Sequence, residues 1–172
     1  MTAFIALLRA VNVGGTGKLA MGDLKAICEQ AGGQNVRTYI ASGNVVFSSS
    51  RSEAHVRAAL ERGLAAHAGK PVGVLVRTAS EMQSVLAQNP FSDAAPNRTV
   101  AIFLDLPPPA DAAAAAVGRQ EEAIALGTRE IYVFYGEGMA ASKLRIPAAK
   151  TGTARNMNTV AKLVALATQL SG

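Results

Sequence analysis

Apolar residues fall into short runs and helical stripes along this chain, and their spacing predicts the secondary structure of its first part. Residues 4–8 form an apolar run that is short enough for a buried strand. A glycine-rich stretch at 12–18 separates this run from residues 24–31, where apolar side chains recur at helical spacing. The predicted order is therefore strand, glycine loop and helix.

Two strands joined by a tight turn are predicted next. β-branched and aromatic residues indicate strands at 36–40 and 45–47. Ser42, Gly43 and Asn44 between them have strong turn chemistry, although their polar groups could also serve a site. In the fold expected below, we place this hairpin at the sheet edge opposite the glycine loop, and we favour the turn role.

A second helix and a fourth strand complete the first half. Ser50 and Glu53 form a capping-box pattern before a helix that ends at Gly69, and residues 71–76 read as a strand. The order through residue 77 is βαββαβ. This order predicts a ferredoxin-like unit, in which an antiparallel sheet carries both helices on one face.

The remaining residues predict a second, smaller α+β half. A capping-box pattern at Thr78 and Glu81 opens a short helix. The other predicted elements are a strand at 100–104, a helix at 112–116, a hairpin of 123–126 with 131–135, and helices at 141–144 and from Thr153 to about 170. We therefore expect an α+β protein with two subdomains, 1–77 and 78–172, the second ending in a basic amphipathic helix.

Charge is distributed unevenly along the 172 residues, whose net charge is +5. Residues 1–138 hold twelve basic and twelve acidic side chains, whereas 139–172 hold five basic side chains and no Asp or Glu. Such asymmetry favours a polyanionic partner or a phosphorylated ligand, or it simply gives a soluble basic surface.

Cysteine content and hydropathy bear on the compartment. A single cysteine excludes an internal disulfide framework and suggests a reducing cytosol. No apolar run approaches the ~20 residues that a membrane span needs, and the first residues read as a strand rather than a signal peptide. We therefore expect a cytoplasmic protein without a membrane partner.

The glycine loop fits neither common nucleotide-binding motif. A phosphate loop needs a glycine and a hydroxyl residue where this chain has Asn12 and Leu19, and the dinucleotide motif fits only in part. A looser anion site remains possible, in which backbone N–H groups are helped by Arg9 and Lys18. A plain connecting loop is the alternative.

The predicted last helix carries polar and cationic residues on one side. Residues 157–167 give an apolar stripe, and Arg155, Thr159 and Lys162 fall on nearly the opposite face. Together with the positive end of the helix dipole, these groups would favour an anion. A solvated amphipathic helix capped by Thr153 explains the same pattern.

Catalytic and metal-binding patterns are absent from the sequence. Ser142 and Lys143 are adjacent, so on a helix they would not face each other, and the Ser-x-x-Lys arrangement is missing. No Cys/His set has metal-ligand spacing, and Cys28 falls on an apolar stripe as a small buried hydrophobe. We expect no metal and no cofactor, and the sequence leaves open whether the protein is an enzyme.

Four stretches in fixed order resemble one family closely. They are residues 6–15 (ALLRAVNVGG), 38–47 (TYIASGNVVF), Ser142-Lys143, and 153–162 (TARNMNTVAK). The chain resembles the bacterial family catalogued as domain of unknown function 1697. The resemblance implies a cytosolic α+β protein with a ferredoxin-like first half, and it implies no activity. The candidate ligand-binding residues, chosen for polarity within these motifs and the glycine loop, are Arg9, Asn12, Lys18, Ser142, Lys143, Arg155, Asn156, Thr159 and Lys162.

Three functional hypotheses remain open. The leading one is binding of an anionic ligand, either a nucleotide-like small molecule or nucleic acid, in a cleft between the two halves where Arg9, Lys18, Lys143 and Arg155 would converge. The second is an enzyme acting on a phosphorylated or carboxylated small molecule, which would require a carboxylate near the basic cluster. The third is a structural or interaction module, whose oligomeric state the sequence does not decide.

Overall fold

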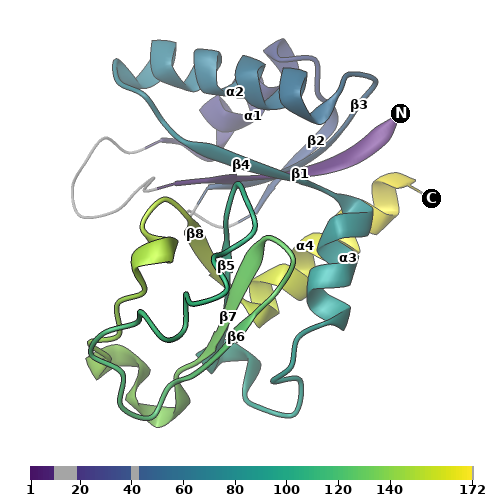
Figure 1. Cartoon of the computed structure of the whole chain (residues 1–172). Coiled ribbons are helices and arrows are strands. Elements are labelled where there is room, and N and C mark those ends of the chain that lie inside the picture. The colour runs from purple at the N-terminus through teal and green to yellow at the C-terminus, as the bar shows by residue number, and fades with distance from the viewer. Residues whose placement is uncertain (10–18, 40–42, 172) are drawn as a thin grey trace. The chain divides into compact units, whose positions relative to one another are not determined.

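The protein is an α+β chain, as the sequence predicts, with two four-stranded antiparallel sheets and four α-helices among the residues that the structure describes. The computed structural model describes residues 1–9, 19–39 and 43–171 (Figure 1). It divides into two compact units, a first unit of residues 1–83 with 162–172 and a second unit of residues 84–161. Across the described ranges, no helix is both long and apolar enough to cross a membrane.

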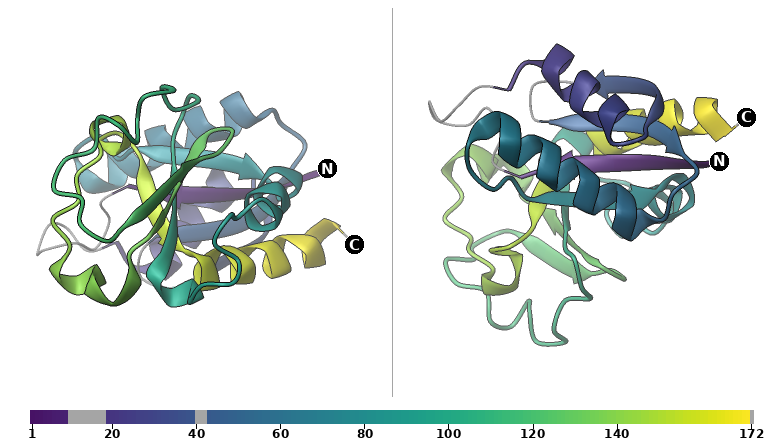
Figure 2. Two further views of the ribbon diagram at one scale, coloured as in Figure 1. Left: turned by 60° about the horizontal axis from the view of Figure 1, so that its bottom comes forward. Right: turned by 90° about the horizontal axis from the view of Figure 1, so that it is seen from above.

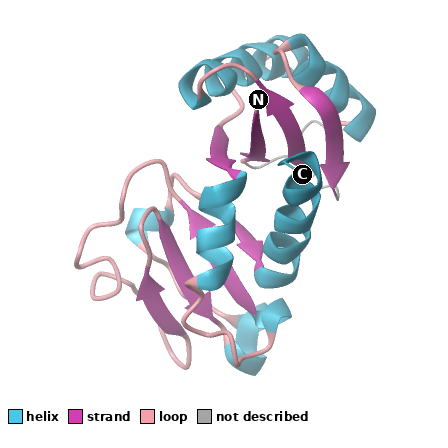
Figure 3. Cartoon of the chain, turned by 90° about the vertical axis from the view of Figure 1, so that its right-hand side faces the viewer, coloured by secondary structure: helices cyan, strands magenta, loops and turns pink. Residues whose placement is uncertain are grey.

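The first unit has the element order βαββαβ. Its elements are β1 (Thr2–Leu8), α1 (Met21–Gln30), β2 (Gln34–Tyr39), β3 (Asn44–Ser49), α2 (Glu53–Ala68) and β4 (Val74–Thr78). The strands lie in the order β2-β3-β1-β4, and every neighbouring pair is antiparallel. Helices α1 and α2 run alongside each other over one face of this sheet (Figures 2 and 3).

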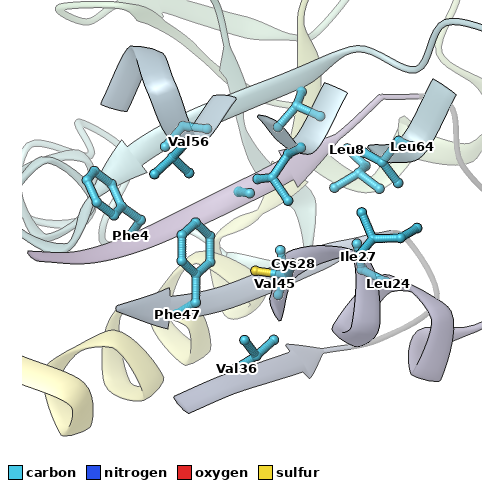
Figure 4. Close-up of a cluster of buried hydrophobic side chains, with 14 of the residues drawn as sticks. Phe4, Leu8, Leu24, Ile27, Cys28, Val36, Val45, Phe47, Val56 and Leu64 are labelled. Atoms are coloured by element: carbon cyan, nitrogen blue, oxygen red, sulfur yellow. The ribbon is translucent and has the colours of Figure 1, made fainter. Parts of the chain in front are cut away.

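One apolar cluster holds these two helices on the sheet. Alternate residues of β1, namely Phe4, Ala6 and Leu8, point into it, because side chains of a strand alternate between its faces. Leu24 of α1 and Leu64 of α2 complete it beside Leu8 (Figure 4). The opposite face of the sheet is also buried, and it carries Ile5, Leu7, Val46, Leu75 and Arg77.

Helix ends in the first unit follow their local chemistry, with one correction. Gly69 ends α2 in the left-handed conformation at φ 73°, as the glycine predicts. The capping box at Ser50 and Glu53 is wrong, because the side chain of Ser52 caps α2 by accepting from the backbone N–H of His55 at 3.2 Å.

The second unit begins within α3 (Ala79–Ala87) and contains the second sheet. The predicted capping box of α3 is confirmed, because Thr78 N–H donates to Glu81 Oε1 at 2.9 Å and Glu81 N–H donates to Thr78 Oγ1 at 3.1 Å. The strands β5 (Thr99–Phe103), β6 (Ala123–Leu126), β7 (Glu130–Phe134) and β8 (Thr153–Asn156) lie in the order β6-β7-β5-β8.

The second half departs from prediction at three segments. The alanine-rich residues 112–116 are not helical, and 112–115 form turns. A short 3₁₀ helix at Gly136–Ala141 ends where the predicted helix at 141–144 was to begin, and residues 142–144 are not helical. Thr153–Asn156 is strand β8, so the last helix, α4, begins only at Met157 and runs to Ser171. Polyalanine favours a helix, but the chain directly after it is held in a non-helical conformation by the backbone pairing of Val117 with Arg145 and by Gly118 at φ 71°.

Candidate functional site

The C-terminal end of β1 brings three separate segments of the first unit together. The backbone N–H of Leu8 donates to the carbonyl oxygen of Gly43 at 2.9 Å. The backbone N–H of Arg9 donates to the carbonyl oxygen of Gly73 at 2.9 Å. We refer to these four residues, with Asn44, as the Arg9 end of the first sheet.

The guanidinium-bearing side chain of Arg9 lies across Gly73. A Cβ placed on Gly73 would be 3.0 Å from Arg9 Cδ and 3.5 Å from Arg9 Nη1. The absence of a side chain at Gly73 therefore allows the Arg9 side chain to lie close to the backbone. Arg9 is half-buried, which holds its cation near the end of the sheet.

The turn between β2 and β3 also lies at the Arg9 end, and this corrects the expectation that it lies opposite the glycine loop. Leu7 pairs with Asn44, so β3 begins where the antiparallel strand β1 ends. Gly43 adopts φ 82°, as a turn glycine can. Asn44 is fully buried, and its Nδ2 donates to the carbonyl oxygen of Tyr39 at 3.0 Å. Two of the four motifs thus meet here.

Helix α1 begins near the same end. Leu24, in its first turn, lies beside Leu8 (Figure 4). The N-cap residue is Ala20, which makes no side-chain capping hydrogen bond. The first N–H groups of a helix have no partner within it, and together they form a positive dipole end. Asp23 in this turn lies 3.8 Å from His67, measured from Oδ2 to Nε2.

Two candidates of this region, Asn12 and Lys18, lie outside the described residues, as does Ser42 of the turn. Their contribution to the Arg9 end stays a prediction. Among the described ranges, no group of three or more His, Cys, Asp and Glu side chains is arranged to hold a metal ion.

In the second unit, Ser142 is engaged by a carboxylate that sequence reasoning missed. The hydroxyl of Ser142 donates to Glu122 Oε2 at 2.5 Å, and its oxygen accepts from the backbone N–H of Leu144 at 3.2 Å. Glu122 also accepts from the backbone N–H of Gln120 at 2.6 Å. These bonds, the one from Ser142 first, lower the pKa of Glu122 below its ordinary value.

The loop that carries Lys143 is held in place by the segment of Val117 and Gly118. Val117 and Arg145 exchange backbone hydrogen bonds of 2.8 Å in both directions. Gly118, at φ 71°, packs so closely on Lys143 that a Cβ there would overlap the Lys143 carbonyl oxygen. The Lys143 side chain is exposed. Ser142 and Glu122 therefore act as a clamp that presents an exposed lysine on a fixed loop.

Arg155 is a buried strand residue rather than part of a solvated helix face. It pairs with Ala101 in β8 and is only 6% exposed. Its Nη1 donates to Thr153 Oγ1 at 2.7 Å and to the carbonyl oxygen of Ala154 at 3.0 Å. Burial lowers the pKa of Arg155 to about 10.

The remaining candidates have distinct places around the start of α4. Asn156 Oδ1 accepts from the backbone N–H of Thr159 at 2.9 Å, which caps the helix in place of the expected Thr153. Thr159 is buried, whereas Lys162 is exposed. Met157, Val160 and Ala167 of the predicted stripe are buried. The predicted common face of Arg155, Thr159 and Lys162 is therefore wrong.

Buried charges were the residues that sequence reasoning could not find. Arg77 in β4 is 1% exposed, and its Nη1 donates to the carbonyl oxygen of Val76 at 3.2 Å. Glu122 and Glu130 are also buried. Each stands beside apolar strand residues in sequence, which is a weak signal that its charge points inward. Whether Arg9 and Arg155 share one site depends on the placement of the two units, and it stays a prediction.

Comparisons with known proteins identify a family and a shared fold for this chain, and they assign no activity. The profile of a family described as "Protein of unknown function (DUF1697)" matches residues 1–132. The solved structure of a conserved bacterial protein, SP0830 from Streptococcus pneumoniae, is similar, with a TM-score of 0.79 and 24% sequence identity. The alignment covers 98% of this chain and 99% of that one, so the fold is shared. No curated protein matches.

Proposed function

The chain belongs to the family described as protein of unknown function (DUF1697), and we propose that it binds an anionic, phosphate-bearing small molecule at the Arg9 end of the first sheet. The observation that carries the proposal is the pair of hydrogen bonds from Leu8 to Gly43 and from Arg9 to Gly73. Because of them, two motifs that are far apart in sequence meet around one half-buried cation.

The charged side chain and the backbone N–H groups at the Arg9 end of the first sheet favour binding of an anion. Arg9 supplies a guanidinium, whose planar donors suit phosphate and carboxylate oxygens. The first turn of α1 supplies backbone N–H groups without a side-chain cap at Ala20. The negative charge of Asp23 would repel an anion. His67 lies beside Asp23, and a protonated His67 would offset that negative charge. Lys18 and the glycines before it would add further donors.

The fold supports the same proposal. The element order βαββαβ with strand order β2-β3-β1-β4 supports a ferredoxin-like first unit. In such a unit, the ends of β1 and α2 and the beginnings of α1, β3 and β4 lie at one end of the sheet. Loops at that end are free to vary and to carry function, while the sheet behind them stays rigid.

A second candidate, an enzyme acting on a phosphorylated or carboxylated small molecule, is favoured by one observation. The required carboxylate near a candidate cation exists, because Glu122 bonds to Ser142 next to the exposed Lys143. Its lowered pKa makes Glu122 a weak general base at neutral pH. We therefore rank this candidate below binding.

The test is a calorimetric titration of the purified chain with inorganic phosphate, a nucleoside triphosphate and a single-stranded oligonucleotide at ~50 mM salt. We expect a phosphate-bearing small molecule to bind, and Arg9→Gln to weaken binding about tenfold or more, as loss of one charged contact would. Arg62→Gln, an exposed arginine on α2, is the matched control and should not change affinity. Equal effects of the two variants would refute the site. Binding of the oligonucleotide alone would favour nucleic acid as the ligand.

A further inference from the structure

Two short segments of the second unit, 116–119 and 142–146, lie side by side around one antiparallel backbone bridge. Val117 and Arg145 form this bridge by exchanging backbone hydrogen bonds of 2.8 Å in both directions. The side chains of two residues paired in this way stand next to each other on the same side. Gly118 packs on the backbone of Lys143 directly beside the pair. We refer to the two segments together as the Val117 bridge.

Side chains of the segment 142–146 alternate between the apolar cluster and solvent. Leu144 and Ile146 belong to or pack against the apolar cluster of the second unit. Lys143 and Arg145, which alternate with them, are exposed. This alternation is that of an extended strand, in which residues two positions apart share a face and are separated by about 6–7 Å. Lys143 and Arg145 therefore present two cations on the outward side of the Val117 bridge.

Val117 adds an exposed apolar side chain to the same outward side. It is 56% exposed, whereas Ala116 before it packs against the apolar cluster. Its pairing with Arg145 places the two side chains next to each other. A single exposed valine is ordinary on a protein surface. One that is held on fixed backbone beside two cations offers apolar and charged contact at the same place.

Glu122 ties the two segments together and positions a third cation. Its backbone carbonyl oxygen accepts from Arg119 Nε at 2.8 Å, and its carboxylate accepts from the Ser142 hydroxyl. Arg119 is exposed, and a guanidinium has further donors beyond Nε. Glu122 itself is buried, and neither segment contains Asp or Glu. The cations are therefore held in place before any ligand binds, which lowers the entropy that binding would cost.

We propose that the Val117 bridge binds an acidic segment of a partner protein in extended conformation. Acidic side chains two positions apart in an extended peptide share one face and repeat every 6–7 Å or so, which matches the spacing of Lys143 and Arg145. A carboxylate can also accept two parallel hydrogen bonds from one guanidinium, such as that of Arg145. An apolar residue of the same peptide would cover Val117.

The composition of the Val117 bridge favours a peptide over nucleic acid. Proteins that bind single strands stack the bases on aromatic side chains along a basic groove. Neither segment of the bridge contains an aromatic residue. A phosphate backbone would also leave the exposed Val117 without an apolar partner. An acidic peptide with apolar residues satisfies both the cations and the valine.

The experiment is fluorescence polarisation of a labelled peptide of alternating Glu and Val, about six residues long, titrated with the full chain at ~50 mM salt. We expect saturable binding. Lys143→Gln and Arg145→Gln should each weaken it about twofold to fivefold, as loss of an exposed ion pair does, and the double variant about tenfold. Val117→Ser should weaken it about threefold, because the apolar contact is lost.

Matched controls change the same kinds of side chain elsewhere. Lys25→Gln and Arg62→Gln remove exposed cations of the first unit. Leu106→Ser replaces a leucine that is 73% exposed outside the Val117 bridge. All three variants should bind the peptide as the wild-type chain does. Circular dichroism confirms that every variant is folded.

A peptide of alternating Glu and Ser and a single-stranded oligonucleotide of the same charge complete the test. We expect the Glu-Ser peptide to bind about threefold more weakly than the Glu-Val peptide, and the oligonucleotide more weakly still. Absence of saturable binding by the Glu-Val peptide would overturn the proposal, as would equal losses in the bridge variants and their controls. Tighter binding of the oligonucleotide, lost in Lys143→Gln and Arg145→Gln, would overturn the choice of a peptide as the ligand.

Discussion

The side chain of Arg9 lies over Gly73, whose backbone carbonyl oxygen accepts from the Arg9 N–H at 2.9 Å. Gly73 thus positions both the backbone and the side chain of Arg9 at the end of β1. Gly73→Ala should push the Arg9 side chain away, because the new Cβ would be 3.0 Å from Arg9 Cδ. We expect weaker ligand binding with a stability change below ~1 kcal/mol, since a flexible side chain yields cheaply.

A reference for the stability effect alone is Gly22→Ala in the first turn of α1, where an added Cβ meets nothing within 4 Å. It should raise the free energy of unfolding by roughly 0.5–1 kcal/mol, because alanine is the better helix former. Denaturant unfolding and ligand titration of both variants separate the two effects. Unchanged binding by Gly73→Ala would show that the position of Arg9 does not matter.

The close packing of Gly118 on Lys143 predicts a large effect on stability. Gly118→Ala should lower the free energy of unfolding by ~2 kcal/mol or more, since it adds both left-handed strain and an overlap with backbone. Gly136→Ala has a similar φ of 64° but open space around it, so it should cost only about 1 kcal/mol. Urea denaturation measures both, and equal losses would contradict the packing between Gly118 and Lys143.

The clamp between Glu122 and Ser142 predicts a pH dependence. The pKa of Glu122 in the folded chain is lowered, chiefly by the Ser142 hydrogen bond. The stability that ionised Glu122 contributes is therefore fully present at pH values above the pKa of this carboxyl in the unfolded chain. It is lost as the pH falls through the lower pKa of the same carboxyl in the folded chain. Glu122→Gln should reduce stability at neutral pH and flatten the decline on the acid side. Thermal unfolding from pH 7 to pH 3 checks this, and an unchanged slope would contradict it.

Arg155 is predicted to stabilise the folded chain. Arg155→Ala should lower the free energy of unfolding by ~2 kcal/mol, because it removes hydrogen bonds that a buried guanidinium makes to Thr153 and Ala154. Lys162→Ala, at an exposed position of α4, should stay within about 0.5 kcal/mol of wild type. Guanidinium chloride unfolding compares the two. Similar stabilities would mean that Arg155 is not buried as described.

Cys28 predicts a simple probe of the first unit. It is fully buried, and burial raises its pKa to about 12. Very little of this thiol would therefore be ionised at pH 8 even if it were reachable. A thiol-specific reagent should therefore label Cys28 only as the chain unfolds. Rapid labelling under native conditions would contradict this placement.

The first half was predictable because its signals are local. Apolar runs and the glycine at the end of α2 mark its elements directly. The location of the turn at Gly43 was mispredicted, although it follows from topology, since β3 antiparallel to β1 must begin where β1 ends. That inference needs the sheet order and not only the element order.

The second half was less predictable because its decisive contacts are distant in sequence. The helical period of α4 continues backward through Thr153–Asn156, so these residues read as helix although pairing with β5 makes them a strand. Glu122 and Ser142 are twenty positions apart and lie on different segments. No periodicity in either segment indicates that they meet.

The most direct test of the proposed function is amide chemical-shift mapping of the isotope-labelled chain during titration with a phosphate-bearing small molecule. We expect the amides of Leu8, Arg9, Gly43 and Gly73 to shift together with those of the first turn of α1, and we expect Arg9→Gln to reduce these shifts strongly at the same ligand concentration. Shifts confined to the loop around Lys143, or no saturable shifts at the Arg9 end with any phosphate-bearing ligand, would contradict it.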